Sequence, residues 1–278
     1  MRLAALRKEY HRSICQHVLR LTNGVPNMAD KDNRASMAIG LRLIELLGYP
    51  VATDKVTGQS KGKRFEQVTR DFLNEAFSLL LHVRPGEWGF EVGPSIARFE
   101  QYRHLAYLQE TLTKYPELAS ALGGDYLVEP DIVVARFPLS DEEIDRFAPV
   151  LDDSVARHSP LRAINRSGGI PLLHASISCK WTIRSDRSQN VRTEALNLIR
   201  NRKGHTPQVM VVAAEPLPTR LASLALGTGD LDCVYHFALP ELVKAVEAVS
   251  EDQLDMLHTM IDGNRLRDIS DLPLDLAV

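Results

Sequence analysis

The sequence lacks a long apolar segment: across its 278 residues, no run approaches the roughly 18 apolar residues that a membrane-spanning helix needs. The amino-terminal stretch MRLAALRKEYHRSICQHVLRL is interrupted by charged residues too early to resemble a secretory signal. We therefore expect a cytoplasmic protein that has no membrane as a partner.

Cysteine is scarce, and its spacing forms no recognisable pair. The chain has three cysteines without a CxxC motif, and its nine histidines show no spacing typical of zinc ligands. These features exclude a disulfide framework and a structural zinc site as organising elements, and they indicate a reduced, intracellular protein.

An excess of positive charge is also missing. The formal net charge of −3 argues against a protein that coats nucleic acid through overall basicity. Basic residues are nevertheless concentrated between Lys180 and Lys203, where seven Lys or Arg accompany two Asp or Glu. A basic patch on an acidic chain is compatible with a nucleic-acid groove, although solvated helix faces have a similar composition.

The first half of the chain contains helical periodicity. Apolar residues recur at helical spacing over residues 3–21 and 37–47, and further helices are predicted from about Lys63, over 97–115 and over 116–122. We therefore expect a mostly helical amino-terminal half.

The second half changes to strand periodicity. Runs of strand length occur in YLVEPDIVVARF, LLHASISCKW, QVMVVAAE and DCVYHF, with helices between several of them. An acidic excursion over residues 138–169 separates the first two. The pattern predicts an α/β fold in which a central mixed β-sheet is flanked by α-helices. No repeat or long linker divides the chain, so we expect a single domain, residues 1–278.

The segment LLHASISCKW has polar residues along one face. As a strand, it places His174, Ser176, Ser178 and Lys180 on the same side. One interpretation is an edge strand whose outer face is solvated. The other is a face of small polar groups that leaves room for a ligand beside the lysine.

Asp131 follows Pro130, and proline is tolerated in a strand only at its start or at a sheet edge. If this strand pairs with LLHASISCKW, Asp131 and Lys180 can approach each other. Their pair could be a simple salt bridge or half of a metal-dependent phosphodiesterase site. In such a site, carboxylates hold Mg²⁺ and a lysine orients water or offsets phosphate charge.

A second carboxylate is available on the predicted helix after this strand. Glu194 lies fourteen positions after Lys180, at the edge of the apolar stripe. A partly buried glutamate needs a partner, and a metal ion or Lys180 would serve. Alternatively, Glu194 is solvated or paired with Arg192 or Arg200.

Together these features resemble a known family. The pattern combines Pro-Asp at 130–131, Ser-x-Lys at 178–180 and Glu194 with the segments HVRPGEW, ALGTG, DCVYHFAL and RDISDLPLDLAV. It is similar to the NgoMIV-like type II (subtype IIF) restriction endonucleases, a branch of the PD…(D/E)xK nucleases. In this branch the second acid has moved from the strand to the following helix. The resemblance covers essentially the whole chain, and it implies a restriction-endonuclease-like core.

The resemblance implies a Mg²⁺-dependent catalytic site. Asp131 would be the central metal ligand, and the backbone carbonyl of Cys179 would help to hold the same ion. Lys180 would position the attacking water.

Further site residues follow from the resemblance. Ser178 stands where related nucleases often have the second acid, and Glu194 would replace that acid as a metal ligand. Glu66, in GKRFEQV, matches another acidic residue of the family's site. Arg70 lies four positions after Glu66, so an ordinary surface ion pair is the alternative.

The segment RSDR would read DNA sequence. In the family, residues equivalent to Arg184, Ser185, Asp186 and Arg187 read CCGG through the major groove. The chemistry fits, because arginine donates two hydrogen bonds to guanine and aspartate accepts one from the cytosine amino group. The alternative is a polar turn that caps a helix at Ser188.

Three other positions match DNA-contacting residues of the family. Asp30 and Arg220 would read an outer G·C pair, and Gln59 would contact the minor groove. The implied target in double-stranded DNA is GCCGGC, cut after the first G to leave 5′ CCGG overhangs.

A palindromic target implies a homodimer. NgoMIV-like enzymes join two dimers into a homotetramer, for which residues 138–169 are the candidate contact.

Two other functions are possible on the sequence alone. One is a sequence-specific DNA-binding protein without cleavage activity, but a binder would not need Asp131, Lys180 and Glu194 together. The other is a serine hydrolase using Ser178, which the absence of a GxSxG motif disfavours.

Overall fold

A six-stranded mixed sheet forms the centre of the protein. The computed structural model describes residues 2–53, 58–122, 127–165, 169–227 and 229–278. The strand order is β3-β4-β5-β6-β7-β8; β4 runs antiparallel to both of its neighbours, β3 and β5, and β5 to β8 run parallel. Their bounds are β3 (Trp88–Val92), β4 (Ile132–Arg136), β5 (Leu172–Lys180), β6 (Gln208–Ala213), β7 (Cys233–His236) and β8 (Leu266–Asp268). The predicted mixed α/β fold is therefore confirmed.

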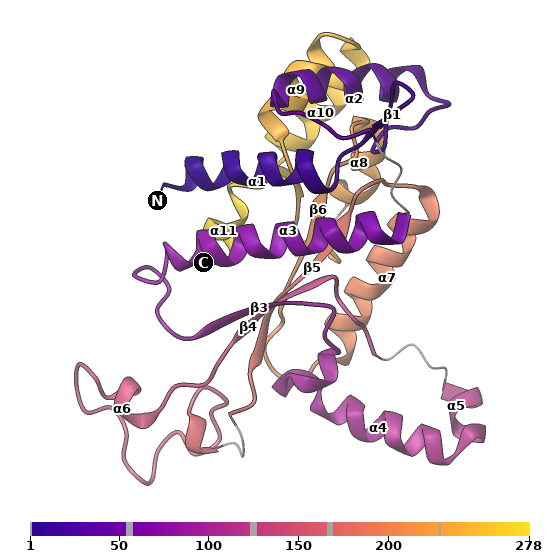
Figure 1. Cartoon of the computed structure of the whole chain (residues 1–278). Coiled ribbons are helices and arrows are strands. Elements are labelled where there is room, and N and C mark those ends of the chain that lie inside the picture. Colours follow the sequence, from indigo (N-terminus) through magenta and orange to yellow (C-terminus); the bar gives the residue numbers. More distant parts are fainter. Residues whose placement is uncertain (1, 54–57, 123–126, 166–168, 228) are drawn as a thin grey trace.

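Helices lie on both sides of this sheet, and α1 and α3 run side by side (Figure 1). The α-helices are α1 (Leu3–His17), α2 (Arg34–Leu47), α3 (Gly58–Ser78), α4 (Arg103–Lys114), α5 (Pro116–Leu122), α6 (Asp141–Ile144), α7 (Ser185–Asn201), α8 (Pro218–Ala225), α9 (Leu239–Glu247), α10 (Glu251–Asp262) and α11 (Leu272–Asp275). Short 3-10 helices span Ile96–Arg98, Glu100–Tyr102 and Ala163–Asn165, and β1 (Leu21–Thr22) pairs with β2 (Val25–Pro26). Within the described ranges, no helix has both the length and the apolar composition to cross a membrane.

The strand β5 is central, so its interpretation as a solvated edge strand is wrong. It lies between β4 and β6, and its residues Ser176 and Ser178 are only 3% and 8% exposed. Helices cover both faces, and β4 and β6 accordingly have nearly continuous apolar sequences.

Several element boundaries differ from those predicted. The first helix ends at His17 because Leu21 joins β1, and α3 begins at Gly58, before the predicted start. The predicted helix over 97–115 is divided into two 3-10 turns and α4. The end of α2 is as predicted, because Gly48 adopts φ +71° and provides the left-handed C-cap.

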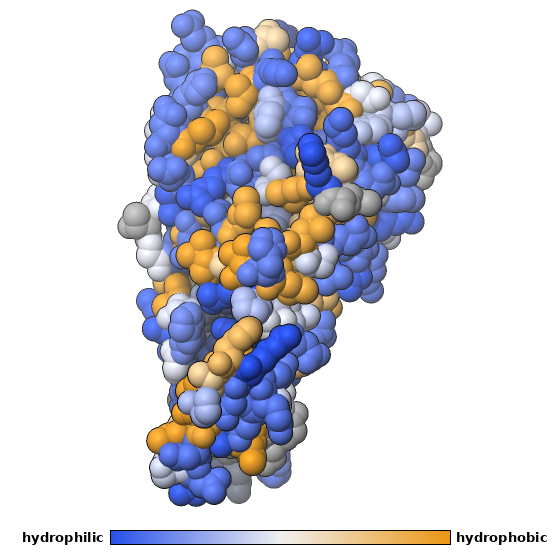
Figure 2. Space-filling view, turned by 90° about the vertical axis from the view of Figure 1, so that its left-hand side faces the viewer, coloured by the Kyte–Doolittle hydropathy of each residue, from blue (hydrophilic) through white to orange (hydrophobic). Residues whose placement is uncertain are grey.

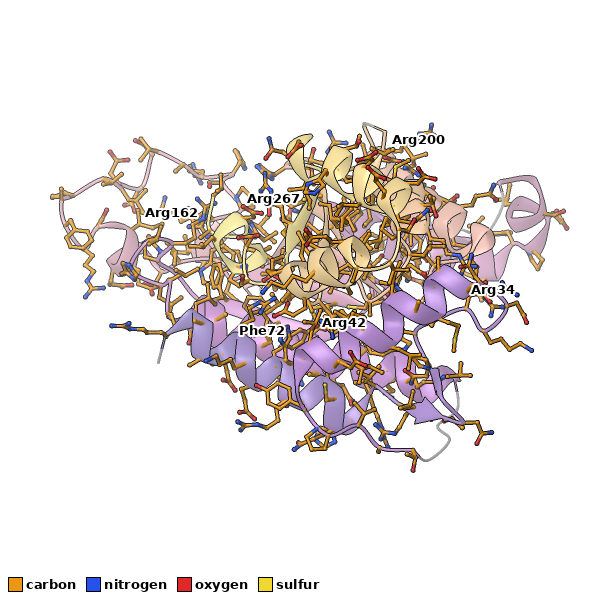
Figure 3. The ribbon with its side chains drawn as sticks, turned by 90° about the horizontal axis from the view of Figure 1, so that it is seen from above. Arg34, Arg42, Phe72, Arg162, Arg200 and Arg267 are labelled. Atoms are coloured by element: carbon orange, nitrogen blue, oxygen red, sulfur yellow. The ribbon has the colours of Figure 1, made fainter. Side chains whose placement is uncertain are left out.

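The acidic excursion forms an arm between β4 and β5 that projects away from the sheet (Figure 1). We call residues 138–165 the arm. Arg162 ties it together by donating two hydrogen bonds of 2.7 Å to Asp141 (Figure 3 shows Arg162 at this end of the molecule). Phe147 is 94% exposed and Ile164 is 74% exposed. Figure 2 views the molecule from this side and shows hydrophobic residues, in orange, on the lower part of the molecule.

Candidate active site

The antiparallel pairing of β4 and β5 brings Asp131 and Lys180 together. Ile132 pairs with Ile177, so the start of β4 lies beside the end of β5. Lys180 Nζ donates a hydrogen bond to Asp131 Oδ2 at 2.8 Å, and Cys179 N donates to the same oxygen at 2.7 Å. The Lys180 and Asp131 side chains are only 19% and 24% exposed. The strand pairing expected from the sequence thus produces this approach.

Two helices bring further carboxylates to the same place. Phe65 of α3 is fully buried and packs edge-on against Trp181 at a ring-centroid distance of 5.1 Å, which positions the adjacent Glu66. On α7, the residues Val191, Ala195 and Leu198 are each 1% exposed, as the predicted apolar stripe requires. Glu194 lies at the margin of this stripe.

These residues line one groove of about 570 Å³. Its walls come from β5, α3, α7 and the segments before β4 and α2. They are formed by Asn27, Ala29, Lys61, Gly62, Glu66, Asp131, Cys179, Lys180, Trp181, Thr182, Arg184, Asn190 and Glu194. Ser178 is buried and is not among them. The groove therefore collects four of the five predicted catalytic residues.

The groove brings three carboxylates, Glu66, Asp131 and Glu194, into a partly buried setting. Burial raises the pKa of Glu66, and the charge of Asp131 raises it further. Burial likewise raises the pKa of Glu194, with Lys180 opposing and Asp131 reinforcing the effect. Burial alone would lower the pKa of Lys180, but the charge and hydrogen bond of Asp131 outweigh it and raise that pKa. Lys180 is therefore a stable cation among carboxylates.

Among the described residues, no ion pair joins Glu66 to Arg70, or Glu194 to either Arg192 or Arg200. Arg70 Nε donates to Asp71 at 2.7 Å rather than to Glu66. Arg192 Nη1 donates to Asp230 at 2.5 Å rather than to Glu194. Both glutamates are left facing the groove.

The donor set suits a hard cation with oxygen ligands. Among the described residues, no three His, Cys, Asp or Glu side chains gather closely enough to form a complete metal cage. Mg²⁺ ordinarily keeps several waters and takes only one or two carboxylates from the protein. Asp131 with one of the glutamates of this groove therefore fits the oxygen-ligand chemistry of a divalent cation such as Mg²⁺.

The helix α7 begins earlier than a cap at Ser188 would allow, so that alternative is wrong. Arg184 is the N-cap residue, with extended φ and ψ, and the helix starts at Ser185. The side chains of Ser185, Asp186, Arg187 and Gln59 lie outside the described residues.

Arg184 connects the first groove to a second one. This groove, of about 560 Å³, is also lined by Asp30, Asp32, Ile183, Thr219, Arg220 and Ser223. Arg220 Nη2 donates a hydrogen bond to Asp30 Oδ2. The Asp32 amide and then Arg220 lower the pKa of Asp30, which keeps it ionised. The two residues predicted to read the outer base pair are thus in contact beside Arg184.

Glu215 was not among the residues predicted from the sequence, and it lies next to Arg220 of the second groove. Its side chain is fully buried, and its carboxylate accepts hydrogen bonds from Ile183 N at 2.9 Å and Leu217 N at 3.3 Å. Arg220 Nη1 lies 3.9 Å away. Burial raises the pKa of Glu215 to about 7, against the opposing effect of these partners. The sequence feature that could have indicated Glu215 is an acidic residue directly after the apolar strand QVMVVAA.

Lys61 was also missed. It lies on α3, lines the first groove, and burial lowers its pKa. It adds a third cation to the groove, beside Lys180 and Arg184.

Comparison with known proteins identifies the family. The model of the NgoMIV restriction enzyme family matches residues 10–278. The type II restriction enzyme NgoMIV of Neisseria gonorrhoeae is 48% identical over 280 residues, covering 98% of this chain and 97% of that protein.

Two solved structures are more distantly similar. They are the restriction endonuclease PspGI–substrate DNA complex (14% identity, TM-score 0.36, 88% of this chain and 66% of that one) and the type IIF restriction endonuclease Bse634I with cognate DNA (12% identity, TM-score 0.37, 92% of each chain). With its near full-length relative, the chain belongs to the NgoMIV restriction enzyme family and is a type II restriction endonuclease.

Proposed function

We propose that the enzyme cuts double-stranded DNA at GCCGGC in a Mg²⁺-dependent reaction, after the first G, leaving 5′ CCGG overhangs. The main support is that one groove contains Asp131, Lys180 and Glu194 and continues through Arg184 to the Asp30–Arg220 pair. Catalytic and base-reading chemistry would then act on adjacent parts of one DNA strand.

Asp131 and Glu194, with Glu66 nearby and the main chain at Cys179, would hold Mg²⁺. The presence of Glu66, Asp131 and Glu194 in one groove supports this, because clustered carboxylates favour a bound cation. When bound, the ion would stabilise phosphate charge and increase the acidity of a water molecule.

Lys180 would orient the attacking water and offset charge on the scissile phosphate. Its ammonium group is anchored by Asp131 at 2.8 Å, so its position is fixed before DNA binds. Its raised pKa keeps it protonated at neutral pH. A fixed cation of this kind favours the transition state, in which negative charge increases on the phosphate oxygens.

Base reading would be shared between the two grooves. Arg184, Ser185, Asp186 and Arg187 would read the inner CCGG, with Gln59 in the minor groove. For the outer pair, Asp30 would accept from the cytosine amino group and Arg220 would donate to guanine. Their mutual contact orients both groups in the absence of DNA.

We further propose a homodimer, because each copy would read one half of the palindrome. Two dimers would join into a homotetramer through the arm, whose exposed Phe147 and Ile164 offer apolar contact area. We place the enzyme in the cytoplasm, consistent with its three free, buried cysteines.

Cleavage of defined plasmids tests the proposal. The purified protein with Mg²⁺ should cut a plasmid bearing GCCGGC and leave intact both a plasmid bearing ACCGGT and one with neither site. Sequencing the ends should show 5′ CCGG overhangs. Equal cutting of the first two plasmids would remove Asp30 and Arg220 from specificity, and cutting without a divalent ion would remove the metal.

A further inference from the structure

A separate cavity lies at the end of β4 and β5 that is opposite to the active-site groove. It has a volume of about 940 Å³, larger than the active-site groove. Arg136, at the end of β4, and Leu172, at the start of β5, contribute to its wall, whereas Lys180 ends β5 in the active site. At about 3.3 Å per residue, this length of β5 separates the two sites by about 26 Å.

Positive charge dominates the wall of this cavity. Four cations line it, namely Arg84, Arg103, Arg136 and Lys203, and Glu100 is the carboxylate among its lining residues. Within the described part of the chain, none of the four cations forms an ion pair. Burial lowers the pKa of the lining His174 and His104, so the charge resides on the arginines and the lysine.

Arg84 and Arg136 are in an unfavourable arrangement on their own. The Nε atom of each is buried and has no hydrogen-bond partner. Burial, and then the nearby charge of Arg84, lowers the pKa of Arg136. Arg136 also lies over the Trp88 ring at 5.5 Å, which restricts its position. An anion between or beside these two like charges would satisfy the buried donors and offset the repulsion.

We propose that this cavity binds a phosphoryl group, carried by a small phosphate ester or by a DNA strand. The planar guanidinium forks of Arg84 and Arg136 match phosphate oxygens in charge and in geometry. Leu172 and the 64% exposed ring of Tyr107 provide apolar surface for the organic part of an ester. Phosphoryl binding in this cavity would be separate from the proposed cleavage reaction and would depend on neither its metal nor its target sequence.

Phosphate titrations of the whole protein test this inference. Inorganic phosphate, pyrophosphate and AMP are titrated separately in EDTA at pH 7.5, and binding is followed by calorimetry and by the melting temperature. The wild type should show saturable binding. Arg84→Gln and Arg136→Gln should each weaken it about tenfold or more, because each removes a charge-assisted fork. Arg42→Gln is the matched control, since Arg42 lies on α2, pairs with Glu45 and should leave binding unchanged (Figure 3).

The melting temperature separates a binding role from a structural one. In phosphate-free buffer, Arg84→Gln should not lower it, because the substitution removes a like-charge contact. At saturating phosphate, the wild type should be more stable than the variant. The conservative Arg136→Lys should bind with intermediate affinity, since it retains the charge but not the fork. A stability difference that is the same at every phosphate concentration would overturn the proposal.

Two further measurements identify the source of the phosphoryl group. Tighter binding of AMP than of inorganic phosphate would indicate a small ester. The second measurement uses a short duplex that lacks GCCGGC. If phosphate displaces this duplex from the wild type but not from Arg136→Gln, a DNA strand supplies the phosphoryl group. Failure of all these anions to saturate the protein, or equal affinity in wild type and both variants, would contradict a phosphoryl site.

Discussion

The buried carboxylate of Glu215 makes a quantitative prediction about stability and pH. It is fully buried, and its pKa rises from 4.5 to about 7 in the folded protein. The folded state therefore holds this proton more tightly than the unfolded chain does. Its contribution to stability is fully present below about pH 4.5 and is lost as the pH rises to about 7.

Glu215→Gln should remove this dependence on pH. Glutamine does not titrate, although its single amide oxygen would lose one of the bonds from Ile183 N and Leu217 N, at a cost of about 1 kcal/mol. One pKa unit corresponds to about 1.4 kcal/mol. The free energy of unfolding of the variant, minus that of the wild type, should therefore increase by about 2.5 kcal/mol between pH 5 and pH 8.

Urea unfolding at four values between pH 5 and pH 8 measures this difference. Other titrating groups are common to both proteins and cancel in the subtraction. Glu45→Gln is the matched control, because it makes the same substitution at an exposed position of α2. If the difference in free energy of unfolding for Glu215→Gln stays constant within about 0.5 kcal/mol over this pH range, the carboxylate titrates at its ordinary pKa, and burial does not raise it.

Three further predictions concern specificity, stability and assembly. Arg220→Ala should reduce the preference for GCCGGC over ACCGGT by roughly 1–3 kcal/mol, measured as the ratio of cleavage rates, whereas an unchanged ratio would contradict outer-pair reading. Arg192→Met should destabilise the protein by roughly 2 kcal/mol in urea without changing specificity, because it leaves Asp230 and the carbonyls at the end of α8 unpaired. Phe147→Ser should shift sedimentation from tetramer towards dimer; sedimentation of the wild type as a dimer alone would exclude the arm as the tetramer contact.

The sequence predicted the centre of the site because local signals coincide there. Pro130 marks a strand start, the alternation in β5 sets the direction of Lys180, and the apolar stripe of α7 places Glu194 at its edge. Each signal is set by neighbouring residues. Once β4 and β5 pair, the approach of Asp131 to Lys180 follows from register alone.

Features that depend on distant residues were not predictable. The strand β8 has three residues and β3 contains a glycine, so both are defined by their pairing partners rather than by their composition. The small serines of β5 looked solvated, yet β4, β6 and the covering helices bury them. The burial of Glu215 likewise depends on Ile183 and α8, which no local pattern reveals.

In the proposed reaction, Asp131 organises a metal-dependent phosphodiesterase site. Single-turnover cleavage of a GCCGGC duplex by Asp131→Asn in Mg²⁺ tests it most directly, with binding to the same duplex measured in Ca²⁺. We expect a rate at least about 10³-fold below that of the wild type, the equivalent of losing several kcal/mol of metal-derived stabilisation, with DNA affinity retained. A cleavage rate within a few-fold of the wild type would contradict this role of Asp131.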